Sequence, residues 1–333
     1  MKLSIVILCW NDLKVIPDCL RSIYEGTHST EFEVIVSDNG SVDGTIEFIR
    51  KNFPQVHLIE NGINLRFAKG NNVGIQASRG EYILILNPDT IIHDGSLDKM
   101  VAYAEKHPEG GAFGCRVVNP DGSYQEHVRP PYTVRSEWCA ALCLGPLSYF
   151  SEWFQPGVYW GWKGNTERTV GWLAGCFILV RGELLKHLKG FDEQFFYYYE
   201  DTDLCRRIWD SGFPILYTPD FSITHLKGQS TKQRITRVSL ALDSCVTRYM
   251  YCYKFYGARG VRSCRRAVLT GLALRMLGYS IIYLGRQNES TKKYQELCRT
   301  LFEWNYRVDP VRLVENGEEP VLANPPLDRV MDR

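Results

Sequence analysis

Short apolar runs alternate with helical patterns along the first 118 residues, and this alternation constrains the fold more than any other feature. Apolar residues at helical spacing occur, for example, between residues 13 and 26 and between residues 97 and 107. Strands and helices that alternate in this way predict βαβ units, with a mostly parallel sheet joined by right-handed crossovers. The expected strands, rich in β-branched and aliphatic residues, are 3–10, 32–37, 56–60 and 112–118, together with the stretch 81–89, which begins with a charge and stops at Asn-Pro-Asp.

One of these strands leads directly into Asn87-Pro88-Asp89. Because proline cannot donate a hydrogen bond to a neighbouring strand, we expect Asp89 to lie just past the carboxyl end of its strand. Open α/β sheets bind ligands at that edge, so this acid could hold a divalent cation against a phosphate. The alternative is an aspartate that only ends a strand in a turn.

The familiar phosphate-binding loops are absent from the sequence. Neither GxGxxG after the first strand nor GxxxxGK[ST] at any position occurs, which argues against a dinucleotide-dependent oxidoreductase and a P-loop enzyme. Asp38, at the end of the second strand, could instead contact a base or a ribose. Asp-Asn-Gly is also ordinary turn chemistry that needs no ligand, so both interpretations of Asp38 stay open.

Acidic residues follow aromatic ones in the second half of the sheet region. Glu200, Asp201 and Asp203 come directly after five aromatic residues at 195–199. Aromatic neighbours would desolvate a carboxylate and raise its pKa, which suits a general base, whereas an acidic first helical turn is the plainer interpretation. His225, which follows a later strand, is either a structural histidine or a second metal ligand.

Residues 123–170 are rich in Trp, Tyr, Pro and Gly and show weak periodicity, which favours a long binding loop over a core element. Its aromatic residues could stack on sugar rings or only pack the loop. Residues 171–181 are expected to form one strand, in which Gly171 and Gly175 would let another group approach the backbone closely.

The net charge of +1 conceals an uneven distribution. Between residues 227 and 293 the chain carries 14 Lys and Arg against two acids, which leaves a net −11 for the remainder. This basic third suggests that one face meets something anionic. Within it, the apolar run 267–284 is interrupted by Arg275 and reaches only the lower limit for a membrane span. A basic amphipathic helix on an anionic membrane surface fits better, and a pair of core helices is also open.

The 11 cysteines are scattered without a CxxC pair or a His/Cys cluster. This arrangement argues against a zinc site or a disulfide framework and favours reduced thiols in the cytosol. Met1-Lys2 leads directly into the first strand, so no targeting segment is expected. The tail 309–333 has few apolar residues and is expected to be poorly ordered.

Several short motifs follow one another between Leu3 and about Ser230. They are Trp10-Asn11, Asp38-Asn39-x-Ser41-x-Asp43-Gly44-Thr45, Asn64-x-x-Phe67-Ala68-x-Gly70-Asn71-Asn72, Asn87-Pro88-Asp89, Gly190-Phe191-Asp192-Glu193-x-Phe195-Phe196, Glu200-Asp201-x-Asp203-Leu204-x-x-Arg207 and His225. In this order they make the chain resemble the family 2 glycosyltransferases of the GT-A fold, most closely the dTDP-rhamnosyltransferase-like branch. The resemblance implies a Rossmann-like, mostly parallel sheet flanked by helices, with a C-terminal helical extension.

The resemblance also implies roles for individual residues. Asp89 matches the last acid of the family's DxD metal motif, and His225 matches a second ligand of Mn²⁺ or Mg²⁺. Asn87 replaces the first acid of that motif, which leaves one charge fewer for the cation. Asp201 matches the general base, with Glu200 beside it. The residues implied in donor binding are Asn11, Asp38, Asn39, Asp43, Phe67, Lys69, Gly70, Asn71 and Asn87. Those implied in acceptor binding are Trp172, Leu173, Ala174, Gly175 and Tyr199.

We therefore expect an inverting, metal-dependent glycosyltransferase of cell-surface polysaccharide biosynthesis. It would move a sugar, L-rhamnose from dTDP-L-rhamnose in the favoured case, to a glycan or a lipid-linked oligosaccharide. The divalent cation would stabilise the leaving diphosphate while Asp201 removes the acceptor proton. A UDP-hexose or UDP-galactofuranose donor is the alternative within this fold, and a non-catalytic nucleotide- or glycan-binding protein is the alternative outside enzymes. No nucleic-acid partner is expected, and the oligomeric state is open.

The expected organisation is a GT-A catalytic domain at 1–230 followed by a basic helical extension at 231–308 and the tail. Within the catalytic domain, residues 1–118 would bind the nucleotide sugar, and residues 119–230 would carry the acceptor-binding and catalytic half. Such a protein would work in the cytoplasm, at the inner face of the cell membrane if the extension contacts anionic lipid.

Overall fold

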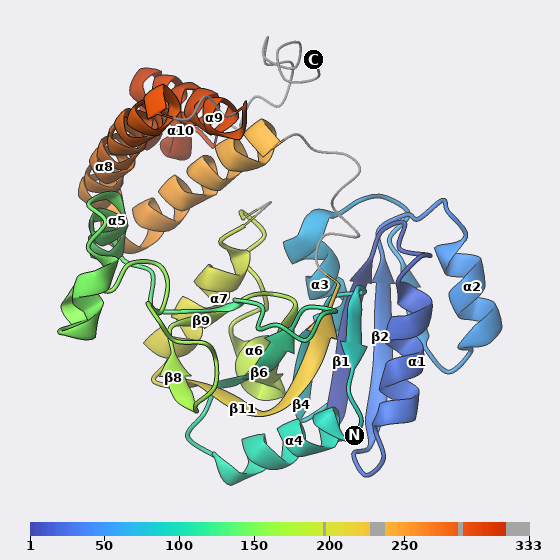
Figure 1. Ribbon diagram of the computed structural model, residues 1–333. Helices are drawn as coiled ribbons and strands as arrows, with labels where there is room; N and C mark the ends of the chain where they lie inside the picture. The colour runs from blue at the N-terminus through green and yellow to red at the C-terminus, as the bar shows by residue number, and fades with distance from the viewer. Residues whose placement is uncertain (196–197, 227–236, 286–288, 318–333) are drawn as a thin grey trace. The chain divides into compact units, whose positions relative to one another are not determined.

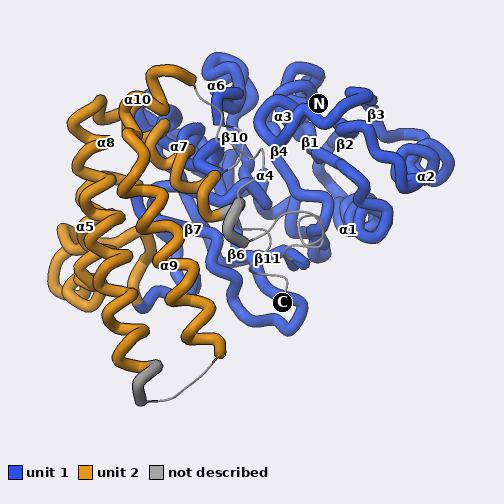
Figure 2. Tube along the Cα trace, turned by 90° about the horizontal axis from the view of Figure 1, so that it is seen from above, with its two compact units in different colours: residues 1–131, 161–234 blue, residues 132–160, 235–333 orange. Residues whose placement is uncertain are grey.

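The computed structural model describes residues 1–195, 198–226, 237–285 and 289–317. The chain divides into two compact units, one formed by residues 1–131 and 161–234 and the other by residues 132–160 and 235–333 (Figure 2). The boundary expected between residues 230 and 231 lies outside the described residues. Residues 132–160 belong to the compact unit that contains the C-terminal helices, and their expected place in the acceptor-binding half stays a prediction.

A nine-stranded sheet forms the centre of the first unit (Figure 1). Its strand order is β3-β2-β1-β4-β10-β6-β11-β5, and β8 pairs with β11. The parallel half consists of β3 (His57–Glu60), β2 (Phe32–Asp38), β1 (Leu3–Cys9) and β4 (Tyr82–Leu86). The mostly parallel α/β architecture predicted from the alternating pattern is therefore confirmed.

The other half of this sheet mixes strand directions. β10 (Phe177–Arg181) lies antiparallel between β4 and β6 (Ala112–Val118). β11 (Ile215–His225) runs parallel to β6, whereas β5 (Thr90–Ile92) and β8 (Arg168–Val170) run antiparallel to β11.

Residues 171–181 form two strands, so the prediction of a single strand was wrong. β9 (Trp172–Leu173) pairs with β7 (Val128–Arg129) in a separate two-stranded sheet. The chain then turns through residues 174–176 before β10 begins. Gly171 permits this arrangement because a Cβ there would lie 1.9 Å from the backbone nitrogen of Pro131.

Glycines allow one helix to approach the sheet very closely. The helices of the first unit are α1 (Ile16–Gly26), α2 (Thr45–Asn52), α3 (Arg66–Ala77), α4 (Ser96–Lys106), α6 (Gly182–His187) and α7 (Glu200–Asp210). In α3, a Cβ at Gly70 would lie 2.4 Å from Leu8 Cδ1, and one at Gly74 would lie 2.5 Å from Val6 Cγ1. Larger residues at these positions would push α3, which carries several candidate donor-binding residues, away from β1.

The parallel register brings three strand ends to one edge of the sheet. Cys9 is paired with Asp38, and Ile7 is paired with Leu86. The loops that follow β1, β2 and β4 therefore begin side by side, at the edge where α/β sheets bind ligands.

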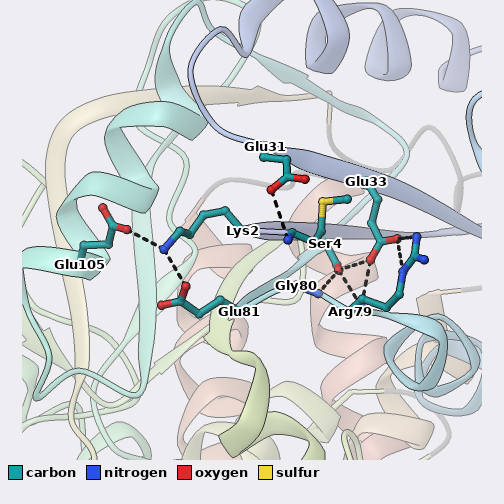
Figure 3. Close-up of polar contacts among 9 residues, drawn as sticks. Lys2, Ser4, Glu31, Glu33, Arg79, Gly80, Glu81 and Glu105 are labelled. Carbon is teal, nitrogen blue, oxygen red and sulfur yellow. Dashed lines mark hydrogen bonds and ion pairs between the residues drawn. The ribbon is translucent and has the colours of Figure 1, made fainter.

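The opposite edge of these strands is held by ion pairs and hydrogen bonds (Figure 3). Lys2 Nζ contacts Glu81 at 2.6 Å and Glu105 at 2.9 Å, and these hydrogen bonds raise the pKa of Lys2. Ser4 Oγ donates to Glu33 (2.6 Å) and accepts from the Gly80 N–H (2.7 Å). This network ties the starts of β1, β2 and β4 together, away from the candidate site.

The second unit is helical within its described residues. Its elements are α5 (Val134–Ala141), the 3₁₀ turns η1 (Gly145–Tyr149) and η2 (Glu152–Phe154), α8 (Arg237–Gly285), α9 (Glu289–Arg307) and α10 (Pro310–Glu315). The long helix α8 breaks at Gly257, whose φ is 62°. Among the described residues, no helix combines the length and the apolar character needed to cross a membrane.

One expectation for this unit needs correction. The segment expected to be irregular contains α5, whose start is fixed by reciprocal hydrogen bonds between Thr133 and Ser136. At the start of the tail 309–333, residues 310–315 form α10, where the Asp309 side chain accepts from the N–H groups of Val311 and Arg312, and residues 318–333 of that tail lie outside the described residues. All 11 cysteines are free, and Cys143 is the exposed one whereas the other ten are buried.

Candidate active site

The loops after β1 and β2 are joined by hydrogen bonds at the ligand-binding edge of the sheet. The Asn11 N–H donates to Ser41 Oγ (2.7 Å), and Asn11 Oδ1 accepts from the Val42 N–H (2.8 Å). Asp38 is fully buried, and its two oxygens accept from the Ser41 N–H (2.7 Å) and the Ser41 hydroxyl (2.6 Å). This is the turn chemistry open to Asp-Asn-Gly, and it presets the loop shape. A contact from Asp38 to a base stays a prediction.

Asn39 and Asp43, two more of the candidate donor-binding residues, form hydrogen bonds that hold these loops in place. Asn39 Nδ2 donates to Asn64 Oδ1 (3.1 Å) and to the Arg66 carbonyl (3.2 Å), which links β2 to the start of α3. Asp43 accepts from the Thr45 N–H (3.1 Å) and from the Leu13 N–H (3.0 Å). Both side chains thus hold the backbone that would surround a nucleotide.

The candidates on α3 differ in their surroundings. Phe67 is partly buried and packs edge-on against Phe191, with ring centroids 5.5 Å apart. Lys69 is exposed, and Gly70 is buried against β1. Asn71 is 1% exposed; its Nδ2 donates to the Phe67 carbonyl (2.9 Å), while its Oδ1 has no hydrogen-bonding partner among the described residues. A buried acceptor without a donor is costly, so Asn71 Oδ1 is a good position for a ligand N–H or O–H.

Asp89 and His225 lie side by side at the end of β4. Asp89 Oδ1 is 3.1 Å from His225 Nε2, and both side chains are largely buried. The pairing of β5 with β11 places them there, since Thr90 lies opposite His225 in the register. The structure therefore brings together the two residues expected to bind a cation.

Gln125 orients the imidazole of His225, and sequence reasoning missed it. Gln125 Nε2 donates to Asn119 Oδ1 (2.7 Å) and to the His225 carbonyl (3.1 Å). These two bonds fix the orientation of the amide, and Gln125 Oε1 then lies 2.6 Å from His225 Nδ1. An amide oxygen accepts only, and Nδ1 must therefore carry the proton. In a neutral imidazole this leaves the Nε2 lone pair directed toward Asp89.

A carboxylate oxygen and an unprotonated imidazole nitrogen 3.1 Å apart repel unless a proton or a metal cation lies between them. Imidazole nitrogen and carboxylate oxygen together form a donor set suited to Mn²⁺, and water or phosphate oxygens commonly complete such a site. No group of three or more His, Cys, Asp or Glu side chains that could hold a metal ion occurs among the described residues. The pair consequently fits a cation whose other ligands come from a bound molecule.

Asp201 lies in the first turn of α7, after Tyr198 and Tyr199, which both have positive φ. Its Oδ2 accepts from the Gly175 N–H (3.2 Å) and its Oδ1 from the Thr202 N–H (2.7 Å). Burial raises the pKa of Asp201 to about 6, and the backbone hydrogen bonds oppose that rise. The carboxylate is thus held in place, and none of the interactions that shift its pKa comes from a cation among the described residues, which suits a general base.

Glu200, beside Asp201, is almost completely buried, and its Oε2 has no hydrogen-bonding partner among the described residues. Burial, and then the neighbouring Asp201 charge, raise the pKa of Glu200 well above its ordinary value. Burial thus favours the protonated form of Glu200, which makes Asp201 the better proton acceptor of the two.

Cys176 connects the two halves of the site. Burial, followed by the charges of Asp89 and Asp201, raises the pKa of this thiol to about 12. Both acids therefore lie within electrostatic reach of one buried thiol. The Asn87 N–H also donates to the Cys176 carbonyl (3.2 Å), and the partly exposed Asn87 side chain lies at the same turn.

The residues expected to contact an acceptor fall into two groups. Gly175 contacts Asp201 directly, and a Cβ on it would lie 2.9 Å from Phe67 Cζ. Tyr199 lies at the start of α7, two residues before Asp201. In contrast, Leu173 is fully buried, the Ala174 N–H bonds to the His127 carbonyl, and Trp172 is partly exposed on β9. Contacts from these residues to an acceptor stay predictions.

A buried ion pair explains one of the motifs. Asp203 is fully buried, and Arg207 Nε donates to its Oδ2 at 2.7 Å. Arg207 also donates to the carbonyls of Leu188 (2.9 Å) and Gly190 (2.8 Å), which fixes the loop before α7. From α3, Asn72 bonds to both the N–H and the carbonyl of Phe191. These contacts position the helix that carries Asp201.

Asp12 is a further acid at this edge, and it was not among the candidate site residues. It is 4% exposed, and its Oδ1 has no hydrogen-bonding partner among the described residues. Burial raises its pKa to about 7, the charges of Asp89, Asp43 and Asp38 add to the rise, and the Trp10 N–H opposes it. Several carboxylates thus concentrate negative potential where β1, β2 and β4 end.

Several known proteins are similar to this chain in sequence. The model of the family described as glycosyl transferase family 2 matches residues 4–159. The N-acetylglucosaminyl-diphospho-decaprenol L-rhamnosyltransferase of Mycobacterium tuberculosis is 33% identical over 219 residues, which cover 60% of this chain and 67% of that protein. The rhamnosyltransferase WbbL of Escherichia coli is 25% identical, over 62% of this chain and 78% of that protein.

Solved structures share the fold at low identity. Residues 1–349 of Staphylococcus aureus TarS in complex with UDP-GlcNAc superpose with a TM-score of 0.52 at 18% identity, covering 95% of this chain and 92% of that TarS chain. A mannosyltransferase from Pyrobaculum calidifontis in complex with GDP-Man and Mn²⁺ gives a TM-score of 0.55 at 15% identity, covering 96% of this chain and 88% of that one.

Proposed function

This chain belongs to glycosyl transferase family 2, and we propose that it transfers L-rhamnose from dTDP-L-rhamnose to a lipid-linked glycan, with inversion and with a divalent cation. The identity of 33% to a decaprenol-linked L-rhamnosyltransferase supports both the sugar and the kind of acceptor. The Mn²⁺ bound by a mannosyltransferase of similar fold supports the cation.

The observation that carries the proposal is the pairing of Asp89 with His225, together with a desolvated Asp201; Asp89 and Asp201 both act electrostatically on the buried Cys176 thiol. When bound, the cation supplies positive charge for the leaving diphosphate. Asp89 Oδ1 and His225 Nε2 would hold it, with the imidazole kept in the required tautomer by Gln125. Asn71 Oδ1, buried without a donor among the described residues, would accept a hydrogen bond from the nucleotide sugar.

Asp201 would remove the proton from the acceptor hydroxyl. Its Oδ2 is held by the Gly175 N–H, so the carboxylate has a fixed position from which it can receive that proton. A single displacement with one base needs no covalent intermediate and inverts the anomeric centre. The cation ligands Asp89 and His225 are separate from the base Asp201. The leaving diphosphate can therefore be stabilised while the acceptor hydroxyl is deprotonated.

Calorimetric titration of dTDP, UDP and GDP, each with and without Mn²⁺, tests the donor. Tight binding of dTDP that depends on Mn²⁺ supports the rhamnosyl assignment, and a preference for UDP would point to a UDP-hexose or UDP-galactofuranose donor. Absence of binding to all three would favour a non-catalytic protein. With the donor known, NMR of the product's anomeric proton distinguishes inversion from retention.

A further inference from the structure

The second half of α8, after the break at Gly257, has one face that is basic at its start and apolar at its end. Arg259, Arg262 and Arg266 are exposed and lie three and four residues apart, which places them on one side of the helix. Leu277 and Ile281 follow on the same side, three and four turns further along.

The apolar end of this face is strongly exposed. The exposed fractions are 45% for Leu274, 61% for Leu277, 63% for Ile281 and 52% for Ile282. Single exposed apolar residues are normal on protein surfaces, but four within nine residues of one helix form a patch. We call the surface formed by Arg259, Arg262, Arg266, Leu274, Leu277 and Ile281 the α8 face.

A second exposed apolar segment in the same unit follows α5. Tyr149 is 68% exposed, Phe150 is 87% exposed and Trp153 is 55% exposed. The end of α5 packs directly on α8, since a Cβ at Gly271 would lie 3.1 Å from the Cα of Ala141. Gly271 precedes Leu274 by one helical turn, so α8 contacts α5 where its apolar end begins. Tyr and Trp side chains favour the interface between lipid and water.

Charge supports one kind of partner for this face. Between residues 244 and 285, α8 contains seven Lys and Arg and no Asp or Glu. A second copy that met this face through residues 244–285 of its own α8 would supply no acid to pair with these arginines, and unpaired charge is disfavoured in the core of a protein interface. Anionic lipid headgroups supply the missing charge, and the acyl region below them accepts Leu and Ile side chains.

We propose that the α8 face binds the surface of an anionic lipid bilayer, with the helix tilted so that its apolar end enters the membrane. The tilt follows from the order of the residues, because the basic and apolar groups succeed one another along the helix. The exposed aromatic residues after α5 would add a second contact. Such docking would bring the enzyme to a lipid-linked acceptor, yet it does not depend on the identity of the donor.

Flotation of the full-length protein with vesicles tests the proposal. We expect binding to phosphatidylcholine vesicles that contain phosphatidylglycerol, weaker binding in high salt, and little binding to phosphatidylcholine alone. Leu277→Glu and Ile281→Glu should each weaken binding by about tenfold, because a charged group replaces a membrane-inserted one. Replacing Arg259, Arg262 and Arg266 together by Gln should weaken it by about tenfold or more.

Ile63→Glu is the matched control, because Ile63 is 65% exposed but belongs to the first unit. It should bind vesicles like the wild type. Circular dichroism of each variant checks that the fold is kept. Equal vesicle binding by the α8 variants and the wild type, or no binding by the wild type, would overturn the proposal. A further contradicting outcome would be a wild-type protein that does not bind vesicles but forms a dimer in light scattering. If Leu277→Glu dissociated that dimer, the α8 face would be an interface between two copies of the chain.

Donor titration on the same variants separates this proposal from the proposed function. Loss of vesicle binding with nucleotide binding unchanged supports the α8 face as the docking surface. If the wild type binds vesicles through this face but no nucleotide, the proposed function fails while the docking surface stands.

Discussion

Replacing Asp201 by Asn should strongly reduce transfer and, at neutral pH, make the protein more stable. Burial raises the pKa of Asp201 from the ordinary 3.8 to about 6, which means that folding disfavours its ionised form. For a fully buried carboxylate, this difference in pKa corresponds to about 3 kcal/mol of folding free energy. Asp201 is partly exposed, so we discount the figure for solvent screening and expect a gain of about 1–2 kcal/mol.

The gain in stability of the Asp201→Asn variant should depend on pH in a defined direction. Between about pH 4 and pH 6 the folded protein binds more protons at Asp201 than the unfolded chain does, so wild-type stability falls as the pH rises through this window. Asparagine does not titrate. The variant should therefore be more stable than the wild type above about pH 6 and lose this advantage below about pH 4.

Urea unfolding of both proteins at acidic and neutral pH measures the effect, and transfer should fall by about 10²–10⁴-fold if Asp201 is the base. Asp203→Asn is a matched contrast on the same helix, since it breaks the buried pair with Arg207 and should cost about 3–5 kcal/mol. A less stable Asp201→Asn protein at neutral pH would refute the reasoning, because the carboxylate would then be stabilised by a partner and not merely desolvated.

Three further predictions concern the same site. Asp89→Ala should remove the Mn²⁺ dependence of nucleotide binding in calorimetry, and unchanged dependence would exclude it as a ligand. Gln125→Leu should lower Mn²⁺ affinity by about 10–100-fold, because the His225 tautomer is no longer fixed. Gln125→Glu is the control variant, since it keeps an acceptor for Nδ1. Equal Mn²⁺ affinities of Gln125→Leu and the wild type would contradict this role. The rate of transfer should rise with pH around a midpoint of about 6, where Asp201 ionises, and a flat profile would argue against this base.

The fold was predictable where local pattern and tertiary environment agree. Parallel strands buried on both faces appear in a sequence as continuous apolar runs, and β1 and β4 have this pattern. The turn between β9 and β10 was not predictable, because it depends on how closely Gly171 packs on Pro131. The short helix α5 was missed for a similar reason: its apolar side is buried by α8, a partner more than a hundred residues away.

The site was predictable in part. Asp89, Asp201 and His225 could be named because each follows a recognisable motif. Gln125 gives no local signal, since a single glutamine in an aromatic segment acquires its role only from a histidine 100 residues later in the chain. Asp12 was missed because an acid after a strand is an ordinary helix-start residue, and only its burial distinguishes it.

The single exposed cysteine makes the protein easy to label. Cys143 lies in the segment between α5 and η1, whereas the other ten thiols are buried. Burial raises the pKa of several of them, including Cys176, so these thiols are poor nucleophiles at neutral pH. A thiol-reactive fluorophore should therefore attach at Cys143 of the unmodified chain. Its emission would report on the polarity around the aromatic residues after α5, without first removing the other cysteines.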